Sequence, residues 1–156
     1  MFDVYIQKVA LEKAHAHAAQ GAAAGEETMG LLVGNVYSYQ GRKWVLVEDY
    51  VTAKNKATSV SVKFSKDSFS SLAQKIFPLV STSMVIVGWM HSHPGLDCFL
   101  SYTDLDTQQK FFNSDWAIAA VCDPSKAEQG LVKTRVYRLS DPASDHYSEL
   151  SYAVIS

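Results

Sequence analysis

Two histidines, two residues apart, follow an apolar segment of the chain. The segment Met84–Trp89 is rich in β-branched residues and predicts a buried strand that continues to His91 and His93. Because side chains alternate along a strand, His91 and His93 lie on one face and Ser92 on the other. Pro94 lacks a backbone N–H and should end the strand. Two imidazoles at a strand end are placed to bind one metal ion.

A hydrolytic zinc site needs a third protein ligand and an open position for water. Asp104 is the candidate, because it follows a loop and begins a predicted helix over Leu105–Phe112. His91, His93 and Asp104 would then hold one Zn²⁺ per chain. The alternative is that the histidines are ordinary packed or solvated side chains, since His-x-His alone has many false matches.

The start of the predicted helix contains two possible capping boxes. Ser101-x-x-Asp104 and Thr103-x-x-Asp106 both match the pattern Ser/Thr-x-x-Asp/Glu. We favour Thr103 as the cap, because this register leaves Ser101 and Asp104 free for the metal site.

The spacing His91-x-His93-Pro94, then Ser101-x-x-Asp104, resembles the motif of the JAMM (MPN-plus) zinc metalloproteases. That family also has an upstream Glu-x-x-Gly, which Glu27-Thr-Met-Gly30 matches. The neighbouring residues resemble the branch containing the proteasome-lid deubiquitinase and the signalosome deneddylase; they are Gly88, Trp89, Cys98, Leu100, Thr107 and Gln108. The resemblance extends from about Val4 to Leu139.

The resemblance implies a role for each site residue. Glu27 would be the general base that takes a proton from the attacking water and passes it to the leaving amine. It would not be a zinc ligand in the resting state. Ser101 would donate a hydrogen bond to the oxyanion. From the residues alone, Glu26 and Glu27 face opposite ways, and both could be solvated charges at a strand end.

The resemblance also implies the substrate, which is an isopeptide bond between a lysine and the tail of ubiquitin or a ubiquitin-like protein. A proteasome-type or other MPN partner is implied as well. Two alternatives are a JAMM peptidase acting on a sulfur-carrier protein or another amide, and a non-catalytic MPN scaffold. The resemblance also places the family's first insertion, which folds over the bound modifier tail, at the segment 52–61; the alternative is an ordinary surface loop.

The chain departs from its relatives beside the motif. Where they carry Cys-Trp-Leu-Ser-Gly, this sequence has Phe99 in place of Trp and Tyr102 in place of Gly. Asp97 replaces a small residue before Cys98. These changes alter the rim of the predicted pocket. We expect Cys98 itself to be a small buried residue.

The predicted strand that carries His91 and His93 is apolar and must be buried within a larger domain. Helices are predicted over Val9–Ala19, with Gly21 and Gly25 bracketing its end, and over 65–77, with Phe69, Leu72, Ile76 and Phe77 as a core stripe. Further strands are predicted at Val4–Gln7, Thr28–Val33, Val36–Tyr39, Lys43–Tyr50, 60–64, Trp116–Cys122 and Leu131–Leu139, with a turn at Asp123-Pro124. We therefore expect an α/β (α+β) fold with a mixed sheet flanked by a helix on each side.

The remaining histidines are predicted to lie outside the site. His15 and His17 fall on different faces of the first helix and cannot chelate together as the strand pair can. His146 lies among acidic residues in the tail.

The composition and charge of the chain exclude several classes of protein. The 156 residues fit a single catalytic domain over 1–156, and 47% apolar with 19% charged content indicates a folded chain. A net charge of −2 gives no electrostatic footprint for nucleic acid or an anionic membrane. No apolar run has the length of a membrane span, and no signal peptide is evident at the N-terminus. Two cysteines favour a reducing, cytoplasmic setting.

Overall fold

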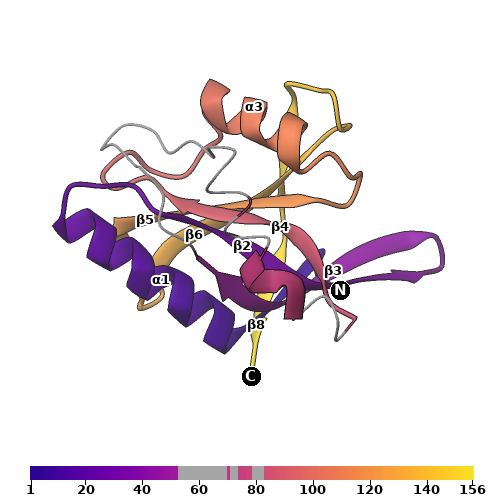
Figure 1. The fold of residues 1–156 in the computed structure, drawn as a ribbon, viewed down its shortest axis with the longest axis horizontal. Helices are drawn as coiled ribbons and strands as arrows, with labels where there is room; N and C mark the ends of the chain where they lie inside the picture. The colour runs from indigo at the N-terminus through magenta and orange to yellow at the C-terminus, as the bar shows by residue number, and fades with distance from the viewer. Residues whose placement is uncertain (53–69, 71–73, 79–82) are drawn as a thin grey trace.

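A computed structural model describes residues 1–52, 70, 74–78 and 83–156 of the chain. The described strands are β1 Val4–Gln7, β2 Met29–Tyr39, β3 Arg42–Val51, β4 Val85–Ser92, β5 Ile118–Glu128, β6 Leu131–Leu139, β7 Tyr147–Leu150 and β8 Tyr152–Ile155. Two helices are described over their whole length, α1 Lys8–Ala23 and α3 Tyr102–Phe111, and residues 74–78 are also helical. Figure 1 shows α1 and α3 on opposite sides of the strands.

All eight strands belong to one mixed sheet with the order β7-β6-β5-β4-β2-β3-β1-β8. β4 pairs parallel with β5, and β1 pairs parallel with β3 and β8, whereas the other pairs are antiparallel. One apolar cluster joins the sheet to α1, and a second joins the opposite face to α3. The predicted α/β class, with a mixed sheet and a helix on each side, is therefore confirmed.

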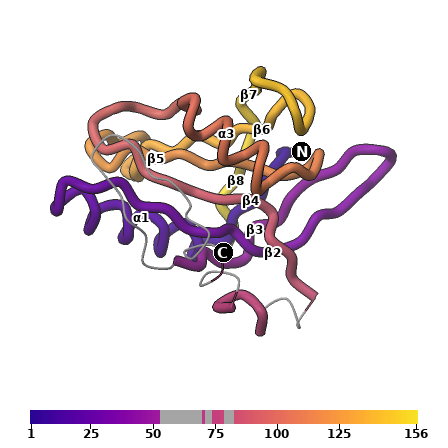
Figure 2. Tube along the Cα trace, turned by 45° about the horizontal axis from the view of Figure 1, so that its top comes forward, coloured from indigo at the N-terminus to yellow at the C-terminus, as the bar shows by residue number. Residues whose placement is uncertain are grey.

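The two edges of the sheet are joined by a single residue. β7 ends at Leu150 and β8 begins at Tyr152, yet these strands occupy opposite ends of the strand order. Ser151 connects them, and its N–H and hydroxyl donate to Asp3 Oδ2 at 3.0 and 2.9 Å. The sheet must therefore roll up until its edges meet at Ser151, as the C-terminal segment crossing the other strands indicates (Figure 2).

Two predicted boundaries were wrong. Helix α1 runs to Ala23, beyond the predicted end at Ala19, although it does end between Gly21 and Gly25 as predicted. Asp123-Pro124 lies inside β5, which continues to Glu128 around an irregularity between Asp123 and Ala127. The chain reverses instead at Gln129 and Gly130, whose φ angles are 51° and 78°. A proline is tolerated within a strand at such an irregularity, because no ladder hydrogen bond is required of it there.

Several other predicted elements are confirmed. β1 and β6 have the predicted bounds, and β2 and β3 form the predicted hairpin, with Gln40 and Gly41 at φ 50° and 78°. The predicted loop at 52–61 and strand at 60–64 lie outside the described residues, apart from residue 52. Of the predicted helix at 65–77, residues 70 and 74–77 are described and are helical. Ile76 is buried as expected, but Phe77 is 74% exposed and is not a core residue.

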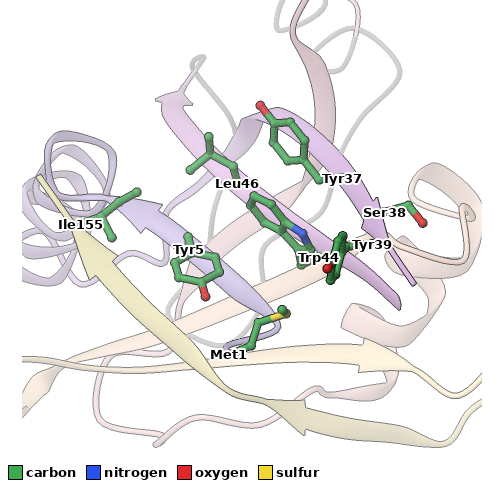
Figure 3. A pocket seen from close by; sticks show the side chains of 8 residues that line it. All are labelled: Met1, Tyr5, Tyr37, Ser38, Tyr39, Trp44, Leu46 and Ile155. Carbon is green, nitrogen blue, oxygen red and sulfur yellow. The ribbon is translucent and has the colours of Figure 1, made fainter. Parts of the chain in front are cut away.

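The face of β3 and β1 that points away from α1 carries an aromatic pocket (Figure 3). Trp44 stacks on Tyr37 with ring centroids 4.4 Å apart and meets the edge of Tyr5 at 5.4 Å. The pocket has a volume of about 540 Å³ and also includes Met1 and Tyr39. None of its lining residues belongs to the predicted metal site.

Candidate metal centre

The end of β4 brings His91 and His93 together on one buried face. Their side chains are 2% and 3% exposed, and their Nε2 atoms lie 3.1 Å apart. Ser92 points to the other face, where its hydroxyl oxygen accepts the Thr28 N–H at 2.8 Å. The alternation expected from the sequence is therefore present, and it aims two imidazole nitrogens at a common point.

Asp104 supplies a third donor atom from the first turn of α3. Its Oδ2 lies 3.0 Å from His91 Nε2 and 3.2 Å from His93 Nε2. In a tetrahedral zinc site with bonds of about 2.0–2.1 Å, neighbouring ligand atoms are about 3.3 Å apart. The three donor types and their mutual distances therefore fit a zinc ion, which the three residues would bind on one side.

The predicted capping register was wrong. Ser101, not Thr103, is the N-cap of α3, because the Ser101 hydroxyl accepts the Asp104 N–H at 3.2 Å. Asp104 Oδ2 accepts the Ser101 N–H in return at 2.9 Å. Capping and metal binding are not exclusive, because a carboxylate has about four lone-pair positions and can accept the Ser101 N–H while it faces the histidines. The Ser101 O–H remains able to donate.

Glu27 lies two residues before β2, the strand that pairs with β4. The register pairs Met29 with His91, and the Ser92 N–H donates to the Thr28 carbonyl at 2.9 Å, so the chain still follows β4 as it approaches Glu27. The Glu27 carboxylate is close enough to interact with the charges of His93 and Asp104. Glu27 is 2% exposed, and its Oε1 has no hydrogen-bond partner among the described residues. Glu26, by contrast, is exposed. A buried carboxylate oxygen without a partner is costly, which makes it a candidate for contact with a ligand.

The four ionisable groups influence one another. Burial raises the pKa of Glu27 to about 7, with His93 opposing the rise and Asp104 adding to it. Burial would also raise the pKa of Asp104, but the charge and hydrogen bonds of His91 and His93 lower it overall. Burial lowers the pKa of His91, whereas for His93 the hydrogen bond and charge of Asp104 outweigh burial and raise it. Near neutral pH, Glu27 can therefore both accept and release a proton.

The indole ring of Trp89 stacks on the imidazole ring of His91. The two rings stack with centroids 4.2 Å apart and an interplanar angle of 10°. Trp89 Nε1–H donates to Gln108 Oε1 at 2.6 Å, which ties β4 to α3. Gln108 was noted only as a family-like residue, and this buried bond could not be inferred from spacing alone.

Side chains predicted to lie outside the site do so. His15 Nε2 is 2.8 Å from Thr134 Oγ1, and His17 Nδ1 is 2.7 Å from the Tyr50 hydroxyl. In the described part of the chain, the only group of three or more potential metal ligands is His91, His93 and Asp104. Cys98 is partly buried, and its thiol donates to the Lys133 carbonyl at 3.6 Å. Burial raises the pKa of this thiol to about 11, so it stays protonated.

One residue at the site was missed. Asp123 is fully buried, and its carboxylate accepts backbone N–H groups from the loop that follows His93. The sequence signal is an acidic residue directly after a buried apolar strand, although the pattern Asp123-Pro124 also predicts a turn.

The fold and these residues define the class of a JAMM/MPN domain, and comparison with known proteins agrees. The family model described as JAB1/Mov34/MPN/PAD-1 ubiquitin protease matches residues 2–115, and the chain belongs to this family. It is 36% identical over 143 residues to the 26S proteasome regulatory subunit RPN11 of Eremothecium gossypii. It is also 36% identical over 141 residues to the ubiquitin carboxyl-terminal hydrolase RPN11 of Saccharomyces cerevisiae.

These matches cover 90% and 88% of this chain but only 44% of each relative, so the chain spans less than half their length. Among solved structures, protein DSY2949 from Desulfitobacterium hafniense superposes with a TM-score of 0.71. That match covers 97% of this chain and 92% of the other at 20% identity, and so supports the fold alone. No helix in the described ranges is long and apolar enough to span a membrane.

Proposed function

We propose that this chain is a zinc-dependent isopeptidase that removes ubiquitin or a ubiquitin-like modifier from a lysine. The observation that carries the proposal is the position of Glu27. Its buried carboxylate, whose Oε1 has no hydrogen-bond partner among the described residues, interacts with the charges of His93 and Asp104 in the group formed by His91, His93 and Asp104. A general base beside three zinc ligands is an arrangement suited to zinc-assisted hydrolysis of an amide.

In the proposed mechanism, His91, His93 and Asp104 hold the metal. When bound, zinc supplies Lewis acidity, which makes water nucleophilic near neutral pH and polarises a carbonyl. Glu27 orients the attacking water, accepts its proton and delivers that proton to the leaving amine. The raised pKa of Glu27, about 7, suits a group that must both take and give a proton.

Ser101 has the second role in the proposed chemistry. Its hydroxyl oxygen accepts the Asp104 N–H, and this contact fixes the hydroxyl at the start of α3. The O–H hydrogen is then available for the oxyanion that forms on the scissile carbonyl. A donor fixed before the reaction stabilises developing charge without reorganising during the step.

The proposed substrate, partner and cellular location are inferred from the names of the relatives. One is named a ubiquitin carboxyl-terminal hydrolase and others are named proteasome regulatory subunits. We therefore propose ubiquitin or ubiquitin-like conjugates as substrates, a proteasome-type or MPN partner, and a cytoplasmic location. We also propose that residues 1–156 form one catalytic domain.

The test is cleavage of a panel of amides by the purified chain, whose zinc content is measured in the same samples. The panel comprises a lysine-linked ubiquitin dimer, a linear ubiquitin fusion, a sulfur-carrier fusion and a small acyl amide. We expect the lysine-linked dimer to be cleaved, the cleavage to stop with a chelator, and zinc to restore it. Preference for the sulfur-carrier fusion would favour the alternative peptidase. A zinc-loaded chain that cleaves nothing would favour a scaffold and overturn the proposal.

A further inference from the structure

The loop after the metal strand is fastened by one buried carboxylate. Asp123 Oδ2 accepts the Asp97 N–H at 2.8 Å, and Asp123 Oδ1 accepts the Gly95 N–H at 2.9 Å. Oδ1 also accepts the N–H and hydroxyl of Ser125 at 2.9 and 2.7 Å. The carboxylate thus has four donors, two from the loop and two from its own strand, and its residue is 0% exposed.

The parallel pairing of β4 and β5 explains why Asp123 reaches this loop. Ser92 is in register with Cys122, and the His93 N–H donates to the Cys122 carbonyl at 2.8 Å. The next residue along β5 is Asp123, which therefore lies beside the point where the chain leaves β4. An acceptor at that point meets the first N–H groups of the loop.

The loop needs such an acceptor because its backbone is unusual. Gly95 and Asp97 both have positive φ angles, 77° and 68°. Glycine adopts that region freely, whereas a residue with a side chain adopts it at a cost that surrounding contacts must offset. The Asp97 side chain adds outer contacts, to Lys133 at 2.7 Å and Lys126 at 3.2 Å.

The fastened loop in turn sets the orientation of His93. The Asp97 carbonyl oxygen lies 3.1 Å from His93 Nδ1. A carbonyl can only accept, so this contact requires the hydrogen on Nδ1, and Nε2 is then the nitrogen that can offer a lone pair to a metal. Nε2 is the atom that faces His91 Nε2 and Asp104 Oδ2. A hydrogen bond at one ring nitrogen is the usual way in which proteins fix the tautomer and orientation of a metal-binding histidine.

We propose that Asp123 is a positioning residue for the metal centre: it holds the 94–97 loop so that the Asp97 carbonyl fixes His93 with Nε2 towards the metal. The inference deepens the proposed function and rests on it for the identity of the metal. Asp123 touches neither the metal ligands' donor atoms nor a reacting group, so its effect passes through Asp97 and His93.

The test compares two substitutions around the same carboxylate in the full chain. Asp123→Asn keeps the size of the side chain but replaces one acceptor oxygen with a donor, which cannot accept a loop N–H. Ser125→Ala is the matched control, because it removes the 2.7 Å hydroxyl bond to Asp123 and leaves both loop bonds in place. Circular dichroism and thermal unfolding establish that each variant is folded at the assay temperature.

The first readout is zinc affinity, measured by competition with a chromogenic chelator. Loss of a partner that orients a metal ligand typically weakens metal binding by about 10- to 100-fold. We expect that loss for Asp123→Asn and less than a threefold change for Ser125→Ala. A folded Asp123→Asn variant that binds zinc within threefold of the wild type would overturn the inference.

The second readout is measured on the wild-type protein as well, so it tests the inference even if the Asp123→Asn variant does not fold. Long-range ¹⁵N–¹H NMR spectra of the zinc-free chain report whether His93 Nδ1 carries a hydrogen. We expect that hydrogen in the wild type and its partial loss in Asp123→Asn. A wild-type protein whose His93 Nδ1 carries no hydrogen would overturn the inference. Absence of zinc binding by the wild type would instead count against the proposed function, and the tautomer would still test the role of Asp123.

Discussion

Ser101 and Asp104 cap each other at the start of α3, and the shared carboxylate oxygen also faces the histidines. Asp104 Oδ2 accepts the Ser101 N–H at 2.9 Å and lies 3.0 Å from His91 Nε2. The cap therefore holds the carboxylate in place before any metal binds. A ligand fixed in this way loses little conformational entropy on binding, which favours a preorganised centre.

Substitution of Ser101 should separate helix capping from catalysis. Ser101→Ala removes the cap acceptor, and loss of an N-cap costs about 0.5–2 kcal/mol of stability. It also removes the proposed oxyanion donor, which should lower kcat by about 100-fold or more at a temperature where the variant is folded. Thr103→Ala is the control, because Thr103 is not the cap. Its free energy of unfolding and its kcat should both stay near the wild-type values. If Ser101→Ala loses only stability, the hydroxyl has no catalytic role.

Glu27→Gln should bind zinc but hydrolyse almost nothing. The amide keeps the shape of the side chain yet cannot accept the proton of water, and general acid–base catalysis contributes about 10²- to 10⁴-fold. Zinc content and kcat are measured on the same samples. Glu26→Gln provides the matched control, because the neighbouring carboxylate is exposed and should not affect turnover. Wild-type turnover by Glu27→Gln would show that another group is the base.

Strand alternation predicts one part of the site from sequence, because a two-residue period places His91 and His93 on one face. The choice of Glu27 over Glu26 came from the family resemblance, since alternation alone leaves both carboxylates open as solvated charges. The capping register did not follow, because two overlapping boxes satisfy the same local pattern. Only the fold decides which of Ser101 and Thr103 meets the strand end.

Long-range features were beyond the sequence pattern. Asp123-Pro124 is equally compatible with a turn and with an irregular strand, and the pairing of β5 with β6 selects the second. The same holds for the C-terminal segment, where one residue separates strands at opposite sheet edges. Neither arrangement has a local signal, since each depends on contacts between segments far apart in the chain.

Removal of metal should lower the thermal stability of the domain. A ligand present at about 100 times its Kd stabilises the folded state by about 2.7 kcal/mol, which corresponds to roughly 5–10 °C in Tm for a chain of this size. Calorimetry with a chelator, and again after zinc is restored, measures the change. Asp104→Asn should have a lower starting Tm and no response to zinc. An equal response in that variant would mean that zinc stabilises the protein from another site.

Acid should weaken the contact that joins the sheet edges at Asp3. Its Oδ2 accepts both bonds from Ser151, and its Oδ1 accepts from Arg42 at 2.8 Å. Burial alone would raise the pKa of Asp3, but the hydrogen bonds from Arg42 and Ser151 lower it below the usual value. The folded-state pKa is therefore below the unfolded value of about 3.9. The resulting stabilisation is complete above that pH and is lost as the pH falls through the folded-state pKa.

Asp3→Asn should therefore destabilise the protein at neutral pH, by up to about 1.5–3 kcal/mol, because hydrogen bonds to a charged acceptor are weakened. Urea unfolding at several pH values should show that the gap between wild type and variant narrows below about pH 4, where the wild-type carboxylate becomes protonated. Asp115→Asn is the control, because its exposed pair with Lys43 should contribute less than about 1 kcal/mol at any pH. A gap that stays constant with pH would mean that the charge of Asp3 does not hold the sheet edges together.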